Sequence, residues 1–221
     1  MKKKYLVLNA SLFVLIITVG IIFSIDRNLL TKSIASILFV ILGITNLILI
    51  SKEKSSNKFA LFMIVGLFFA MLGDIVLELN FIIGAILFAL GHIWYIIAYS
   101  CLLKFKPTDL IAGFSIFIPS ILLITLAPIF NFDGILMKIV CIIYALIISL
   151  MVGKSIHNLI NQKNVLNVIL VIGSILFFIS DFMLLLSRFA GLHVLSYVCI
   201  NTYYPAQALL SSSIKYSKIN K

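Results

Sequence analysis

The sequence has little charge for its length. Only 7 acidic and 17 basic residues occur among 221, so charged residues make up 11% of the chain, whereas 63% of residues are hydrophobic. A soluble domain carries about 25% charged residues. The shortage excludes a soluble globular protein and leaves no room for a separate soluble domain. It indicates an integral membrane protein.

Cysteine and histidine are also scarce. The three cysteines stand in apolar runs without metal-ligand spacing: Cys101, Cys141 and Cys199. This pattern excludes a disulfide framework and a cysteine zinc site. The histidines fall at three different places of the predicted bundle, with His92 near the midplane, His157 in a cytoplasmic loop and His193 at the outer end of the last span. They cannot converge on one ion, so we expect neither a metal nor another cofactor.

The excess of basic residues has a membrane explanation. A formal net charge of +10 would suit a nucleic-acid partner, but the basic residues lie in short stretches between apolar segments. Such stretches are typical of topology signals and of contacts with anionic lipid. We therefore expect membrane lipids as partners and no nucleic acid; the sequence leaves the oligomeric state open.

The chain contains eight apolar segments. They are, approximately, Tyr5–Ile25, Lys32–Ile50, Lys58–Leu79, Phe81–Leu103, Thr108–Ala127, Gly134–Gly153, Val165–Ser187 and Leu192–Ser213. Each has about the 20 residues that cross a hydrocarbon core as a helix, and lipid requires helices because it cannot satisfy bare backbone groups. The first segment is too long for the apolar part of a signal peptide. We predict an all-α integral membrane protein, a polytopic bundle of eight transmembrane helices forming one domain over residues 1–221.

Basic residues predict the orientation. With the N-terminus in the cytoplasm, 13 of the 17 basic residues face inward. The remaining four face outward: Arg27, Lys32, Lys138 and Arg188. Because lysine and arginine concentrate on the cytoplasmic side, both termini are predicted to be cytoplasmic. We expect a multi-pass protein of the cell membrane, namely a bacterial plasma membrane.

An internal repeat divides the chain. The pattern G-x7-D-x9-G occurs over residues 66–84 and again over residues 173–191. Both copies run from an outward helix into the returning one. We therefore predict two parallel four-helix repeats, about residues 1–107 and 108–221, related by an axis along the membrane normal.

Two carboxyl groups share one predicted depth. Asp74 and Asp181 each lie sixteen residues beyond the start of their segments, which at ~1.5 Å per residue is ~24 Å from the cytoplasmic side. His92 and Tyr203 each lie eleven residues into the next segment, near the midplane. A charge in hydrocarbon costs several kcal/mol, so intramembrane acids usually have a function.

Other polar side chains follow the same helix faces. His92 and Tyr95 belong to one stripe and Tyr203 and Gln207 to another. The candidate substrate-binding residues are His92, Tyr95, Asn201, Tyr203, Tyr204, Gln207, Glu78 and Arg188. Each has a structural alternative: packing carboxyls for the aspartates, a core histidine, tyrosines that pack, a solvated glutamate at the rim and an interfacial arginine anchor.

Four ordered blocks carry a family resemblance. They are LGDIVL at 72–77, GAILFALGHIWY at 84–95, GSILFFISD at 173–181 and TYYPAQALL at 202–210. Together they resemble the YhhN family, the membrane proteins that include lysoplasmalogenase, and their acidic, histidine, tyrosine and glutamine positions match. The resemblance covers the third to eighth spans. It implies a hydrolase that cleaves the vinyl ether bond of a lysophospholipid, releasing a fatty aldehyde and a glycerophospho-alcohol.

The residues suit that chemistry. Vinyl ether cleavage begins with protonation of the outer alkene carbon, followed by addition of water. It needs one carboxylic acid and one carboxylate, as paired carboxylates in glycoside hydrolysis do. We predict Asp74 and Asp181 as the catalytic pair, with the roles of acid and base left open. Arg188 would hold the phosphate as a bidentate donor.

Two other functions are compatible with the same residues. Parallel repeats with intramembrane acids also occur in transporters, including proton-coupled carriers. A non-catalytic lipid-binding protein is the third possibility. Aldehyde release from lysolipid separates the enzyme from both.

Overall fold

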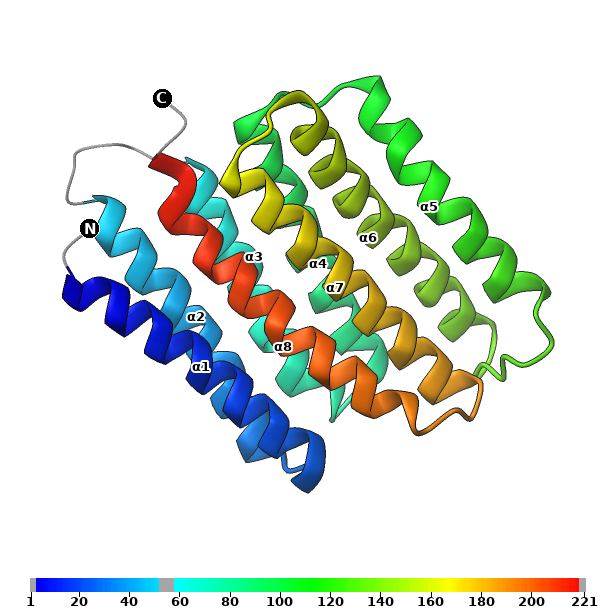
Figure 1. The fold of residues 1–221 in the computed structure, drawn as a ribbon. Coiled ribbons are helices and arrows are strands. Elements are labelled where there is room, and N and C mark those ends of the chain that lie inside the picture. Colours follow the sequence, from blue (N-terminus) through cyan, green and yellow to red (C-terminus); the bar gives the residue numbers. More distant parts are fainter. Residues whose placement is uncertain (1–2, 52–57, 219–221) are drawn as a thin grey trace.

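The long apolar runs form a bundle of helices in the computed structural model, which describes residues 3–51 and 58–218 (Figure 1). The helices are α1 (Lys3–Asp26), α2 (Leu29–Ser51), α3 (Lys58–Leu77), α4 (Phe81–Leu102), α5 (Pro107–Leu126), α6 (Ile135–Asn161), α7 (Val165–Phe189) and α8 (Leu195–Ser213). A short 3₁₀ helix, Ile214–Lys218, follows α8. The described part of the chain has no strand, which confirms the all-α prediction.

Seven of these helices, α1 to α7, are long and apolar enough to cross a membrane. The eighth predicted span, α8, has 19 residues but carries more polar side chains, and its C-terminal half is buried inside the bundle. The chain is a polytopic membrane protein. Of the residues used to predict its orientation, Lys2, Lys52, Lys54 and Lys221 lie outside the described part, and the orientation stays a prediction.

Apart from the end of α6, the helix boundaries lie within three residues of the sequence prediction. Helix α6 continues to Asn161, eight residues beyond the predicted end, because Lys154 and Asn158 find buried partners: the Asp109 carboxylate for Lys154 and the Tyr99 carbonyl for Asn158. Helix α8 begins at Leu195 instead of Leu192, because the preceding residues form hydrogen-bonded turns. A sequence-based prediction thus ends a helix too early where polar residues of that helix are buried against partners on other helices.

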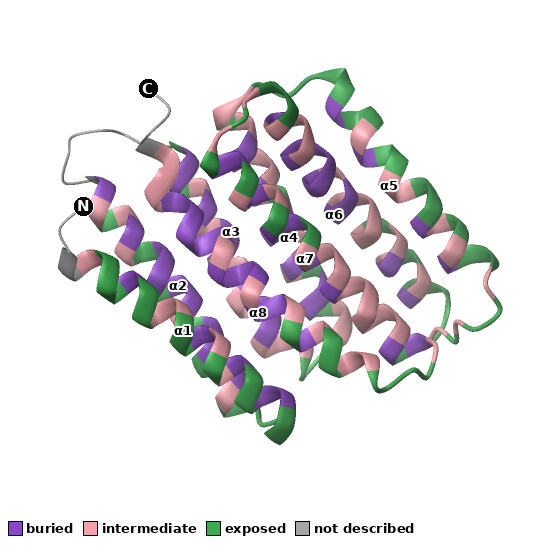
Figure 2. Cartoon of the chain, viewed as in Figure 1, coloured by how far each residue is buried: buried purple, intermediate pink, exposed green. Residues whose placement is uncertain are grey.

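Within the ranges that the structure describes, consecutive helices pack as antiparallel neighbours except α4 and α5, and α8 lies near the centre, where it contacts α1, α2, α3 and α7. The start of α1 and the end of α8 lie at the same end of the bundle (Figure 1). Among the described elements, α5 packs on α6 alone. It forms one edge of the bundle and shows few buried positions (Figure 2).

The glycines of the predicted repeat have unequal roles. A Cβ at Gly84 would lie 2.5 Å from the Leu77 Cα, so a glycine there lets α3 and α4 approach closely. Gly191, its counterpart, lies in the loop before α8 with φ of +71° and open space around it. The helix contacts are more regular: α2–α3, α3–α4 and α4–α6 have counterparts in α6–α7, α7–α8 and α8–α2. The division into two halves stays a prediction.

Candidate functional site

Two pockets lie side by side towards the end of the bundle at which α1 joins α2 and α7 joins α8. Both are lined by Asp181 and by three apolar side chains, Leu77, Phe88 and Leu184. One pocket encloses about 690 Å³ and the other about 560 Å³. Asp181 is therefore the polar group at their common wall.

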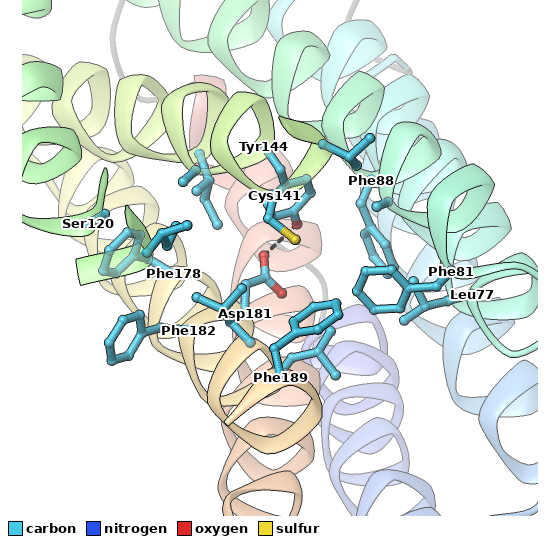
Figure 3. Close-up of a pocket in the computed structure, with 17 residues that line it drawn as sticks. Leu77, Phe81, Phe88, Ser120, Cys141, Tyr144, Phe178, Asp181, Phe182 and Phe189 are labelled. Carbon is cyan, nitrogen blue, oxygen red and sulfur yellow. Dashed lines mark hydrogen bonds between the residues drawn. The ribbon is translucent and has the colours of Figure 1, made fainter. Parts of the chain in front are cut away.

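The larger pocket is apolar. Aromatic rings surround the Asp181 carboxyl, which points into the pocket (Figure 3). Phe81 and Phe189, whose ring centroids lie 5.4 Å apart, form one side. Helix α5 contributes Ser120 and Ile124 to another. These walls suit a hydrocarbon chain rather than a polar group.

The smaller pocket, called the polar pocket below, carries charged side chains on a largely apolar wall. Its lining includes two basic side chains, Arg27 and Lys32, and three acidic ones, Asp74, Glu78 and Asp181. Lys32 Nζ donates to Glu78 Oε1 at 2.7 Å; the Lys32 side chain is 8% exposed and that of Glu78 is 49% exposed. The two predicted catalytic aspartates thus line one pocket.

Asp74 is buried, with 3% of its surface exposed, and a network of hydroxyl and amide groups ends at it. Its Oδ2 lies 2.5 Å from Ser36 Oγ and accepts a bond of 2.7 Å from the Tyr203 hydroxyl. Gln207 Nε2 donates to the Tyr203 oxygen at 3.1 Å, and the Tyr95 hydroxyl donates to Gln207 Oε1 at 3.1 Å. The network fixes the orientation of the Asp74 carboxyl.

Asp181 has its own partners. The Tyr144 hydroxyl donates to Asp181 Oδ2 at 2.5 Å, and His92 Nε2 lies 2.8 Å from the Tyr144 oxygen and 3.6 Å from Oδ2. His92 is completely buried. The Phe177 ring separates the two networks, with centroids 4.6 Å from His92 and 5.2 Å from Tyr203.

The hydrogen-bond partners of Asp74 and Asp181 come from helices that correspond to each other under the predicted repeat. Asp74 on α3 is bonded by α2 and α8, whereas Asp181 on α7 is bonded by α6 and α4. Under the predicted repeat, α2 corresponds to α6 and α8 to α4. The two carboxyls therefore occupy related positions with different side chains around them.

The predicted substrate-binding residues fall into three groups. Glu78, Tyr203 and Tyr204 line the polar pocket. Tyr95 and Gln207 lie behind Asp74, and His92 lies beside Asp181; these three are outside the lining of both pockets. The last two predicted residues, Asn201 and Arg188, also lie outside both linings.

Those two side chains have other contacts. Asn201 is exposed and donates to the Tyr197 carbonyl. The guanidinium of Arg188 lies 4.6 Å from the centre of the Phe81 ring. The attraction between a cation and an aromatic ring directs this side chain toward α4.

Four side chains of the site were not predicted from the sequence: Arg27, Lys32, Ser36 and Tyr144. The predicted depth of Tyr144 in the membrane could have identified it as a neighbour of Asp181. It lies nine residues from the start of α6, and Asp181 lies eight from the end of α7, so both are ~12–14 Å from the same end of the bundle. Arg27 and Lys32 appear in the sequence only as outward-facing charges.

No group of three or more histidine, cysteine or acidic side chains in the described ranges is placed to hold a metal ion. His92 lies beside Asp181, and His157 contacts Asp109 near the opposite end of α6. His193 lies in the loop between α7 and α8. The three histidines are thus apart, and the polar groups that line the two pockets are carboxyl, hydroxyl, thiol and cationic groups.

A bundle of long apolar helices around one buried and one partly exposed carboxyl defines a polytopic membrane protein with an intramembrane polar site. The model of the YhhN family matches residues 28–214, and the chain belongs to that family. The match begins before α2, so it extends further than the four blocks recognised in the sequence. Neither the curated proteins nor the solved structures contain a significant match.

Proposed function

We propose that this protein is a membrane hydrolase that cleaves the vinyl ether bond of a lysoplasmalogen-like lysophospholipid. The position of Asp181 carries the proposal, because this carboxyl lies where an apolar pocket meets a polar one. A lysolipid has the same division, with a hydrocarbon chain joined to a polar glycerol part. With the chain in the apolar pocket, the bond between the two parts lies beside Asp181 and near Asp74.

The number of hydroxyl hydrogens available around Asp74 supports a role for this residue as the general acid. Ser36 has one hydroxyl hydrogen, but its Oγ lies 2.9 Å from the Lys32 carbonyl oxygen and 2.5 Å from Asp74 Oδ2. One hydrogen serves one acceptor. If Asp74 is protonated, it donates to Ser36 Oγ and Ser36 donates to the Lys32 carbonyl, so both contacts are satisfied. Asp74 is therefore the general acid of the proposal.

The ion pairs near Asp74 also support the protonated form of this residue. Among the described residues, no lysine or arginine forms an ion pair with Asp74, because the nearby Lys32 pairs with Glu78. A buried carboxylate without a cation is costly, whereas a neutral carboxyl with hydroxyl partners is not. The protonated form of Asp74 is the one that its surroundings favour.

Asp181 suits the ionised role. It accepts the Tyr144 hydrogen, so the Tyr144 oxygen is free to accept from His92 Nε2–H. His92 Nδ1 is then a buried acceptor, and it has no partner among the described residues. Asp181 is the general base of the proposal.

The reaction then balances without a cofactor. Asp74 protonates the outer alkene carbon, and the ether carbon becomes an oxocarbenium ion beside the Asp181 carboxylate. Asp181 takes a proton from the water that adds to this carbon, which gives a hemiacetal. Asp181 next protonates the leaving ether oxygen while Asp74 removes the hemiacetal hydroxyl proton. The C–O bond breaks, fatty aldehyde and glycerophospho-alcohol leave, and both carboxyls return to their first states.

The test is aldehyde release by purified protein in detergent. Wild-type protein should release aldehyde from a lysoplasmalogen, and Asp74→Asn and Asp181→Asn should each lower kcat by about 10²–10⁴-fold. Asp133→Asn is the matched control, because Asp133 is an exposed acid outside both pockets. Near wild-type turnover in either variant contradicts the paired mechanism. Absence of aldehyde together with lysolipid-dependent proton flux in vesicles would favour a carrier instead.

A further inference from the structure

The lining of the polar pocket contains two cations. Arg27 lies in the connection from α1 to α2 and Lys32 lies near the start of α2, and both line the pocket that contains the two proposed catalytic aspartates. We propose that Arg27 and Lys32 form a binding site for a phosphate group carried on the lipid substrate, with Ser196 holding the Arg27 guanidinium in position. The site rests on the proposed function for the identity of the lipid, and its test measures binding rather than hydrolysis.

The backbone around Arg27 is held by its neighbours. Asp26 accepts bonds from the Asn28 amide at 3.1 Å and the Thr31 hydroxyl at 2.7 Å, and Asn28 Oδ1 accepts from the Leu30 amide at the start of α2. Arg27 itself has φ of +52°, the left-handed conformation that favours glycine. A bulky residue in this conformation costs energy, and such positions cluster at functional sites.

The guanidinium is also held in place. Arg27 Nε donates to the Ser24 carbonyl at 3.0 Å, and Nη2 donates to Ser196 Oγ at 3.0 Å. Its centre lies 4.7 Å from the Tyr197 ring. A guanidinium has five N–H donors, so three remain free after these two bonds. Their planar arrangement suits the oxygens of a phosphate.

Lys32 supplies the second charge. Only 6% of its surface is exposed, and its Nζ lies 5.6 Å from the centre of the Phe23 ring. Its partner, Glu78, has a half-exposed side chain. A bond to an exposed carboxylate is weak in water, so an incoming phosphate oxygen can share the ammonium with Glu78. The ammonium has three donors, which allows both bonds at once.

The arrangement favours a phosphate at the two cations over a free fatty acid. A carboxylate at the end of a hydrocarbon chain would enter the region of the Asp181 carboxylate, where like charge repels it. A phosphate separated from the chain by a glycerol stays at Arg27 and Lys32 while the chain lies in the apolar pocket. The shared lining of the two pockets provides this path.

The experiment compares two lipids that the proposed reaction cannot cleave: an ester-linked lysophospholipid, and a monoacylglycerol with the same chain but no phosphate. Binding to the purified full-length protein is measured by equilibrium dialysis and by thermal shift. We expect the lysophospholipid to bind about tenfold more tightly, as one charge-assisted contact predicts. Arg27→Gln and Lys32→Gln should each remove most of this preference and leave monoacylglycerol binding unchanged.

Lys138→Gln is the matched control, because Lys138 is a basic residue predicted on the same side of the membrane but outside both pockets. Ser196→Ala is a milder variant that removes the Nη2 acceptor, and it should lower the preference by about threefold. Equal binding of the two lipids by wild-type protein, or an unchanged preference in both Arg27→Gln and Lys32→Gln, overturns the proposal. Inorganic phosphate that binds as tightly as the lysophospholipid overturns its assignment to a lipid.

The outcome is separable from that of the proposed reaction. A protein that prefers the phosphate lipid but releases no aldehyde supports the phosphate site and contradicts the hydrolase. A protein that releases aldehyde at the same rate from substrates with and without phosphate contradicts the site alone.

Discussion

Asp74 and Asp181 line one pocket although their helices do not pack on each other in the described part of the chain; α8 contacts both α3 and α7. Each carboxyl accepts a bond from a tyrosine hydroxyl, Tyr203 for Asp74 and Tyr144 for Asp181. The similarity ends there, because a serine completes the first site and a histidine the second.

The first prediction concerns the proton on Asp74. The infrared spectrum of the substrate-free protein at neutral pH should contain the carbonyl stretch of a protonated carboxylic acid. Asp74→Asn should remove that band and Asp181→Asn should retain it, because only Asp74 shares a contact that needs an extra hydrogen. A band that disappears in Asp181→Asn instead would reverse the acid and base roles.

The second prediction concerns Tyr144. Tyr144→Phe removes the donor to Asp181 and the acceptor of His92 Nε2, so kcat for aldehyde release should fall by about tenfold, the loss of one hydrogen bond to a charged group. Tyr99→Phe is the control: it removes a buried tyrosine bond to Ser174, away from both carboxyls. The two variants should lose similar stability, about 1 kcal/mol. Equal losses of activity would assign Tyr144 a purely structural role.

The third prediction concerns the attachment of α5. Lys154 and Asp109 form a completely buried ion pair of 3.0 Å, and His157 contacts the same carboxylate. Lys154→Met leaves a buried carboxylate without its main partner and should destabilise the protein by about 3–5 kcal/mol. Adding Asp109→Asn should restore part of that loss. Thermal unfolding in detergent measures both, and a double variant no more stable than Lys154→Met would argue against charge as the cause.

The fourth prediction separates the backbone of Arg27 from its side chain. Arg27→Gly and Arg27→Ala remove the same guanidinium contacts, but only glycine adopts φ of +52° without a Cβ clash. The glycine variant should be more stable than the alanine variant by about 1 kcal/mol, measured as a higher unfolding temperature. Equal stability would mean that the turn relaxes when the side chain is removed.

Much of the fold follows from hydropathy alone. A run of apolar residues of the right length has one outcome in lipid, so α1 to α7 and the shared depth of Asp74 and Asp181 were accessible from the sequence. The end of α6 was not, because Lys154 looks like a loop residue until Asp109 is placed beside it. Burial of a charge depends on its partner, and the partner lies 45 residues away on another helix.

The site was predicted in part for a similar reason. Helix periodicity places Asp74, Tyr203 and Gln207 on inward faces, and the structure joins them by hydrogen bonds. Helix periodicity cannot decide whether Arg27 or Arg188 lies at the polar pocket, since both are predicted as outward-facing cations. The choice depends on local contacts, a left-handed turn for one arginine and the Phe81 ring for the other.

The correspondence between the partners of the two aspartates has an evolutionary consequence. If each half of the bundle were a separate chain in a symmetric dimer, every substitution would appear twice, and the two carboxyls would have to share one environment. A single chain removes that constraint. Ser36 can hold a hydrogen at one carboxyl while Tyr144 and His92 surround the other. Under the predicted repeat, covalent linkage of the halves is what allows two related acids to become unequal.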